Sequence, residues 1–158
     1  MGVDELFRRE APRLRRYLGR LVGDSDVAED VLQETFVRAM ERREESAARS
    51  WLYTVATNLV RDRARSRERR DRLADRVPQP RPDHAHERAE AGELRERLEA
   101  ALAALSHRER SAVLLRHEGY AQREIAEILG TTTGTIGTLT ARALRKLAAS
   151  DQLKGFRP

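Results

Sequence analysis

Hydrophobic residues recur every three or four positions along most of the chain, which is the spacing of amphipathic helices. In residues 3–22 this apolar stripe consists of Leu6, Phe7, Leu14, Tyr17, Leu18 and Leu21. The same period predicts further helices over residues 25–43 and 49–70, and again between residues 90 and 150. The strict alternation of apolar and polar residues that marks β-strands is missing from the sequence. We therefore expect an all-α protein.

Prolines interrupt the helical pattern at positions 78, 80 and 82, within the stretch RVPQPRPDHAH. Because proline lacks a backbone N–H and clashes with the preceding turn, this stretch is predicted to be a flexible Pro/Arg-rich linker. The sequence thus predicts two small helical domains, at residues 1–72 and 90–150, joined by a linker at 73–89 and followed by a tail at 151–158.

The second domain has the layout of a helix-turn-helix motif. Ile125, Ile128 and Leu129 form one apolar face, Gly130 permits a sharp turn, and a second amphipathic helix follows. The outward face of that helix carries side chains that suit base edges and phosphates: Thr133, Thr135, Thr138, Arg142, Arg145 and Lys146. The alternative is a plain helical hairpin with a solvated face. The turn spacing and the basic end favour DNA binding.

The helix predicted at 49–70 is polar on one side and apolar on the other. At about 100° per residue, Leu52, Val55, Ala56 and Leu59 fall on one side. The other side carries Trp51, Thr54, Asn58, Arg61 and Arg65. Asparagine and arginine can contact base edges, and tryptophan can stack on an unpaired base. The alternative is a tryptophan that anchors the core beside a solvated polar face.

Composition narrows the function further. The net charge of +5 and the pI near 10.3 suit a polyanionic partner. With no cysteine in the chain, disulfides and Cys-ligated zinc are excluded. No apolar run approaches the roughly 20 residues that span a bilayer. The N-terminal MGVDELFRRE lacks the apolar core of a signal peptide. We therefore expect a cytoplasmic protein without direct membrane insertion.

An acidic helix face stands out in this basic chain. On the helix predicted at 25–43, the residues expected in the core are Ala28, Val31, Leu32, Thr35 and Ala39, with Phe36 beside them. The opposite face combines carboxylates and a carboxamide with two apolar side chains: Asp26, Asp30, Gln33, Glu34, Val37 and Met40. Such a face would repel DNA, so its expected partner is a basic protein surface.

Three stretches together resemble a known family: DVAEDVLQETFVRAM, SWLYTVATNLVRDRARSR, and LSHRERSAVLLRHEGYAQREIAEILGTTTGTIGTLTARALRKL. They are similar to regions 2.2, 2.3–2.4 and 4 of extracytoplasmic-function (ECF) sigma factors of the sigma-70 superfamily. The resemblance implies a sigma domain 2 helical bundle, a sigma domain 4 with its helix-turn-helix, and a function in transcription initiation. It implies no enzymatic activity and no cofactor.

The resemblance also implies partners. Asp30, Gln33 and Glu34 would meet the coiled coil on the β′ clamp of core RNA polymerase, with Met40 adding apolar contact, and the β flap would be a second contact. The helix containing Asn58 and Arg61 would engage the −10 element of promoter DNA, and the loop at 42–49 would hold a flipped-out base. Domain 4 would bind the −35 element. The linker would lie along the polymerase toward its RNA exit path. The protein would be associated with the nucleoid when in holoenzyme, and a cognate anti-sigma factor is expected.

Three positions depart from the family pattern. Family members often carry Lys or Arg where this chain has Gly137 and Leu139, so the −35 contacts are expected to differ. Ala121 stands where Ser or Thr usually caps the first helix of the motif.

Three other functions would explain parts of the sequence. An ordinary helix-turn-helix repressor or activator would explain residues 106–150 but neither the acidic face nor the face from Trp51 to Arg65. A metal-dependent hydrolase would use His84 and His86, which lie close together in the linker without a second cluster of ligands. A helical adaptor without a DNA role is disfavoured by the basic segments.

Overall fold

The computed structural model describes residues 2–42, 49–74 and 92–155. Over these residues the protein is helical and contains no strand, as predicted. The elements are α1 (Val3–Val22), α2 (Ser25–Arg42), α3 (Arg49–Ala74), α4 (Gly92–Ala103), α5 (His107–His117), α6 (Gln122–Leu129), α7 (Thr133–Ala149) and the short 3-10 helix η2 (Asp151–Leu153). Most of the loop at 42–49, and most of the linker with His84 and His86, lies outside the described residues.

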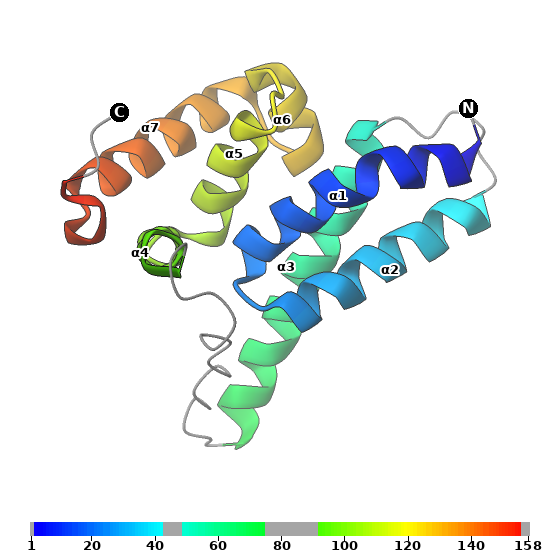
Figure 1. The fold of residues 1–158 in the computed structure, drawn as a ribbon, viewed down its shortest axis with the longest axis horizontal. Helices are drawn as coiled ribbons and strands as arrows, with labels where there is room; N and C mark the ends of the chain where they lie inside the picture. The colour runs from blue at the N-terminus through cyan, green and yellow to red at the C-terminus, as the bar shows by residue number, and fades with distance from the viewer. Residues whose placement is uncertain (1, 43–48, 75–91, 156–158) are drawn as a thin grey trace.

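Helices α1, α2 and α3 form the first bundle (Figure 1). Gly23 ends α1 in the left-handed conformation, at φ 72°, and its N–H bonds to the Gly19 carbonyl. The Asp24 carboxylate then accepts from the N–H groups of Asp26 and Val27, at 2.9 and 3.2 Å, which starts α2. The α2 residues expected in the core are all buried. Phe7, expected in the α1 stripe, is instead 38% exposed, because it lies at the edge of the bundle with its ring against Phe36.

Helix α3 is buried on more sides than its sequence predicts. Leu52, Ala56 and Leu59 are buried as expected, and Val55 is half-buried. Tyr53, Thr57 and Val60 are buried as well. Thr57 Oγ1 lies 2.8 Å from the Tyr17 hydroxyl of α1, and the Tyr53 ring contacts both Tyr17 and Tyr120, the latter from the second half of the chain. The helix also continues to Ala74, beyond the predicted end at residue 70, and its C-terminal part projects away from the bundle (Figure 1).

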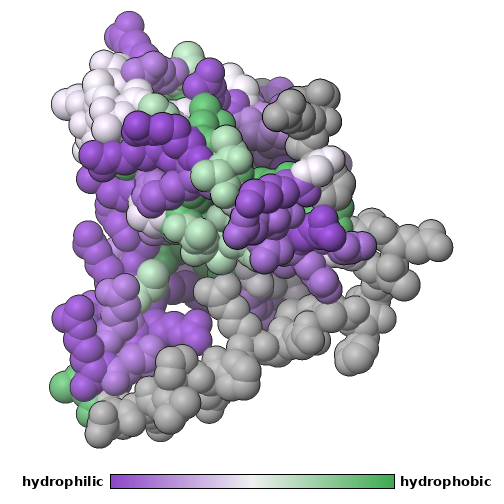
Figure 2. Space-filling view, turned by 90° about the vertical axis from the view of Figure 1, so that its left-hand side faces the viewer, coloured by the Kyte–Doolittle hydropathy of each residue, from purple (hydrophilic) through white to green (hydrophobic). Residues whose placement is uncertain are grey.

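The two halves of the chain pack against each other, α5 on α1 and α6 on α3, so their cores join. Figure 2, which shows the face with α4 and the C-terminal end of α7, has a mostly hydrophilic surface with a narrow apolar band. Arg110 of α5 donates to the carbonyl of Leu21 in α1 at 2.9 Å. The sequence predicted two domains held only by a linker. It did not reveal this direct contact.

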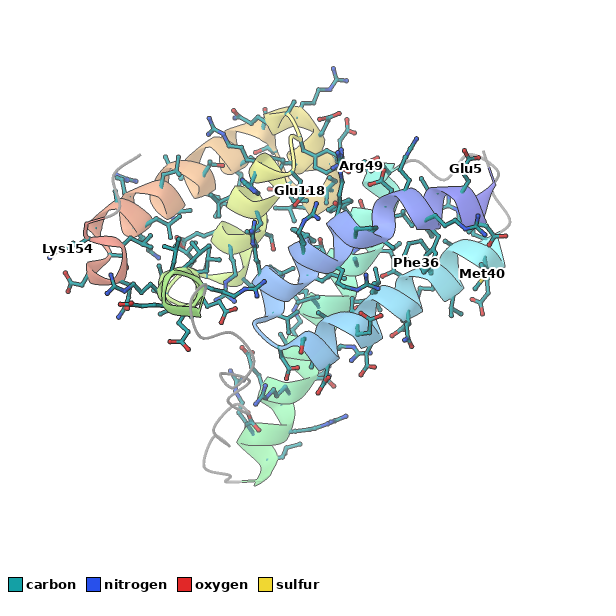
Figure 3. The ribbon with its side chains drawn as sticks, in the orientation of Figure 1. Glu5, Phe36, Met40, Arg49, Glu118 and Lys154 are labelled. Carbon is teal, nitrogen blue, oxygen red and sulfur yellow. The ribbon has the colours of Figure 1, made fainter. Side chains whose placement is uncertain are left out.

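A polar cluster sits where the halves meet. We call it the junction cluster: Glu10, Arg49, Tyr53, Glu118 and Tyr120. Arg49 and Glu118 come from opposite halves and lie close together (Figure 3). The Arg49 guanidinium donates to the Glu118 carbonyl at 3.2 Å, and its carbon lies over the rings of Tyr53 and Tyr120 at 5.5 and 4.8 Å.

Arg49 also neutralises a buried carboxylate. Its Nε lies 3.1 Å from Glu10 Oε2, and the Glu10 side chain is only 3% exposed. Arg9 lies 3.2 Å from the other Glu10 oxygen, but its own side chain is 58% exposed. A charge with so little access to water is costly unless an opposite charge lies beside it. Arg49 is therefore the main counter-ion of Glu10 and also bridges the two halves.

A second buried carboxylate joins α5 to α7. Ser106 and Glu109 form a capping box at the start of α5: the Glu109 N–H donates to Ser106 Oγ at 3.1 Å, and the Ser106 N–H donates to Glu109 Oε1. The Lys146 ammonium donates to the same Glu109 oxygen at 2.8 Å. This hydrogen bond, followed by those from Ser106, lowers the pKa of Glu109 below its ordinary value.

We predict that Arg49→Ala destabilises the protein by about 3 kcal/mol, because it leaves Glu10 without its main counter-ion. Urea unfolding followed by circular dichroism measures the change. Arg9→Ala is the matched control, since it removes the solvent-exposed partner of the same carboxylate and should cost less than about 1 kcal/mol. Equal losses for the two variants would contradict this role of Arg49.

We predict that Lys146→Met lowers the free energy of unfolding by about 1 kcal/mol at pH 7, since half of the Lys146 side chain is exposed to solvent. Glu109 has a lowered pKa in the folded protein, so its pairing stabilises above the unfolded pKa, near 4.5, and is lost as pH falls further. The difference between the variant and the parent should therefore shrink below about pH 4.5.

Urea unfolding at several pH values measures this difference. Lys154→Met is the control: Lys154 pairs with Asp151, and both side chains are largely exposed. It should leave the stability unchanged at every pH. A Lys146→Met effect that stays constant down to pH 3 would contradict the assignment.

Candidate functional site

Helices α6 and α7 form the predicted helix-turn-helix. Gly130 ends α6 in the left-handed conformation, at φ 64°. Thr132 then caps α7 by accepting from the Thr135 N–H at 3.2 Å. Ala121 cannot cap α6 with its side chain, so Glu124 does so from inside the helix, accepting from the Ala121 N–H at 2.7 Å. Between the two helices the buried residues are Ile125, Ala126, Ile128, Ile136, Leu139, Thr140 and Ala143.

Five of the six residues predicted on the α7 face are exposed: Thr133, Thr138, Arg142, Arg145 and Lys146. Thr135 is half-buried, and its hydroxyl is 2.9 Å from that of Thr132 in the cap. Lys146 is turned back toward Glu109. Leu139 is only 9% exposed and belongs to the core, so it offers no side chain to DNA.

Two hollows flank the exposed face of α7. One, of about 500 Å³, lies between Arg108 of α5 and the Gly134, Thr138 and Arg142 side of α7. The other, of about 340 Å³, lies on the opposite flank between Gly137 and the group Arg116, Tyr120 and Gln122. Arg108 and Arg116 are both exposed. Sequence reasoning missed them because only tertiary packing brings α5 beside α7.

The predicted polar face of α3 is partly covered. Trp51, Thr54, Asn58 and Arg61 are half-buried, and Arg65 is exposed. Arg61 donates to the Asn58 amide oxygen at 3.1 Å, which holds the two side chains together. The guanidinium carbon of Arg42 lies 5.0 Å from the centre of the Trp51 ring.

The basic part of α3 also faces the start of α5. Burial, and then the positive charges of Arg110, Arg61 and Arg65, lowers the pKa of His107. Arg61 and Arg65 of α3 thus bring positive charge close to the first turn of α5.

The acidic face predicted on α2 lies at the surface, with five of its six residues exposed. Asp26, Asp30 and Gln33 are exposed, and so are Val37 and Met40, at 46% and 54%. Met40 lies at the C-terminal end of α2 (Figure 3). Glu34 is half-buried and pairs with Arg38 at 3.0 Å and with Arg63 of α3 at 3.4 Å. All six predicted residues thus lie on the side of α2 opposite the core.

Other types of site find no support in the part of the chain that the structure describes. No group of three or more His, Asp or Glu side chains there could hold a metal ion. None of the helices there is both long and apolar enough to cross a membrane.

Comparison with known proteins agrees with this arrangement. The family model "Sigma-70 region 2" matches residues 6–70, and "Sigma-70, region 4" matches residues 95–147. The chain is 34% identical to the RNA polymerase sigma factor CarQ of Myxococcus xanthus, covering 92% of this chain and 87% of CarQ. It is 35% identical to the ECF RNA polymerase sigma factor SigL of Mycobacterium tuberculosis, covering 95% and 89%. It is 36% identical to the ECF sigma factor SigE of Mycolicibacterium smegmatis, of which it spans only 59%.

Solved structures show the same fold. The sigma factor RpoE of Bartonella quintana, in complex with the anti-sigma factor NepR, matches with a TM-score of 0.76 at 25% identity, over 98% of both chains. CnrH, in complex with the cytosolic domain of CnrY, matches with a TM-score of 0.68 at 23% identity, over 93% of this chain and 85% of CnrH. From the matched regions and these relatives, the chain belongs to the ECF family of RNA polymerase sigma factors.

Proposed function

We propose that this sigma factor binds core RNA polymerase through α2 and promoter DNA through α3 and α7, and so directs promoter recognition and −10 melting. The observation that supports this most is the separation of charge. The acidic and apolar face lies on α2, while the polar and basic faces lie on α3 and α7. We further propose residues 1–72 as the unit for polymerase and the −10 element, and residues 90–150 as the unit for the −35 element.

The α2 face suits a basic protein surface. Exposed carboxylates around Val37 and Met40 combine electrostatic attraction with apolar area, which is typical of protein interfaces. We infer that this surface docks on the coiled coil of the β′ clamp, and that domain 4 contacts the β flap. Repulsion between its carboxylates and phosphates keeps α2 off the DNA.

The α7 face suits the major groove. The helix presents Thr133, Thr138 and Arg142 along its exposed side, and the hollows on its flanks hold Arg108 and Arg116. We propose that α7 enters the groove of the −35 element, and that these two arginines bind phosphates of the two strands on either side. Arg145 extends the basic surface along the helix. Thr135 and Lys146 are assigned supporting roles here, because the cap and Glu109 engage them.

The α3 face suits the −10 element. Asn58 and Arg61, joined by their hydrogen bond, would read its upstream edge, and Trp51 would stack on an unpaired base. Thr54 and Arg65 extend the same face. Flipping a base out of the stack costs a few kcal/mol, which binding energy at this face would offset.

A cognate anti-sigma factor is a further proposed partner. RpoE of Bartonella quintana was solved in complex with the anti-sigma factor NepR, and its fold matches nearly the whole of this chain. An inhibitor that stabilised the packing of the two halves would keep the half-buried α3 face from DNA. The proposed place of action is the cytoplasm, at the nucleoid when bound to polymerase.

We predict that Glu34→Arg weakens binding to core RNA polymerase by at least about 100-fold, because it places like charges against each other in the interface. The helical content should stay unchanged, since the ion pairs of Glu34 with Arg38 and Arg63 lie near the surface. Co-purification with core polymerase and circular dichroism measure the two quantities.

Glu99→Arg makes the same change of charge at an exposed position in α4 and is the control for this experiment. It should bind polymerase as the parent does. If Glu34→Arg still formed holoenzyme normally, the α2 assignment would be wrong.

We predict that Asn58→Ala lowers base discrimination in the −10 element on the order of 10-fold, the effect of one lost base contact. Open-complex formation on promoters that vary in one element at a time measures this, and discrimination in the −35 element should stay unchanged. Gln152→Ala removes an exposed carboxamide in η2 and serves as the control. Equal losses at the two elements would count against the assignment.

A further inference from the structure

A side chain from α6 occupies the place above Gly137 of α7. A Cβ atom at position 137 would lie 3.0 Å from Nε2 of Gln122, the first residue of α6. The same Nε2 donates to the backbone carbonyl of Thr133, one turn before Gly137, at 2.6 Å. The carboxamide of Gln122 therefore lies against the recognition helix, where the absence of a side chain at Gly137 leaves room.

The hydrogen bond orients this carboxamide. A backbone carbonyl can only accept, so the nitrogen end of the amide must face Thr133. This leaves Oε1 and the second N–H of Gln122 for another partner. Gln122 is an exposed residue, and the hollow of about 340 Å³ opens beside it.

The amide lies at the edge of the surface that faces DNA. At about 100° per residue, position 137 falls between the exposed Thr133 and Gly134 positions, one turn further along the helix. The buried positions Ile136 and Thr140 lie on one flank of it, so position 137 is at the border between the exposed and the buried side of α7. Because the Gln122 carboxamide is hydrogen-bonded to α7 at this position, it would enter the groove together with α7.

We propose that Gln122 reads a base of the −35 element in place of the side chain that Gly137 lacks. A glutamine carboxamide pairs with adenine by accepting from N6–H and donating to N7, and Gln122 has one acceptor and one donor left for this. The inference rests on the proposed role of α7 in the major groove. Glycine lowers the stability of a helix interior relative to alanine. At position 137 the missing side chain leaves the room that the Gln122 carboxamide occupies.

The test uses holoenzyme assembled from the full chain and core RNA polymerase, with promoter fragments randomised across the upstream element. Sequencing of the bound fragments gives the base preference at each position. The parent should prefer adenine at one position, and Gln122→Ala should lower that preference on the order of 10-fold while the other positions keep theirs.

Gly137→Ala gives a second, independent readout. Its Cβ atom pushes against Gln122 Nε2, so it should weaken the same preference at the same position. The double variant should lose no more than Gln122→Ala alone, because both changes act through one amide. Gly19→Ala in α1 is the matched control: a Cβ there meets no atom within 4 Å, and base preference should be unchanged.

Three results would overturn the inference. The first is a loss for Gln122→Ala that is equal for all sequences, which would mark a phosphate contact. The second is additive losses in the double variant. The third is a Gly137→Ala effect at a different position. If the parent itself showed no preference in the upstream element, the proposed role of α7 would fail, and this inference with it.

Discussion

The buried carboxylate of Glu10 and its counter-ion Arg49 set the main constraint on this fold. Glu10 belongs to α1, Arg49 to the first turn of α3, and Glu118, the third member, to the end of α5. Because a charge shielded from water needs an opposite charge beside it, these three elements must meet at one point. The rings of Tyr53 and Tyr120 enclose the guanidinium from both halves of the chain. Arg49 therefore links α1, α3 and the end of α5 at the place where the two halves of the chain meet.

This constraint places the surfaces that we propose to be functional. Helices α1 and α3 pack against the second half of the chain. The side of α2 opposite the core is therefore available to the proposed protein partner. The α3 face lies close to the junction and is half-covered, whereas the α7 face is open. The chain therefore presents two contrasting surfaces at once: an acidic one with apolar residues, and a helix-turn-helix flanked by arginines. Each can meet a partner that the other would repel.

Sequence periodicity predicted the helices well, because local spacing determines which side of an isolated helix is apolar. The bounds of α1 and the buried residues of α2 agree with the prediction. Helix α3 is buried on more sides than predicted. Thr57 pairs with Tyr17 of α1, and Tyr53 contacts Tyr120 of the second half, and no local sequence pattern reports such distant contacts. Arg108, Arg116 and Gln122 were missed for the same reason. The roles assigned to the individual site residues stay predictions.

Helix α3 packs against the first bundle on one side and against the second half of the chain on another. The two halves therefore share one buried interface. A fragment cut within the linker would expose, on one piece, the side of Tyr53 that contacts Tyr120 and, on the other piece, Tyr120 itself. New apolar surface of this kind promotes self-association. Fragments of this protein should therefore be handled as aggregation-prone species, whereas the intact chain covers the same area without a partner.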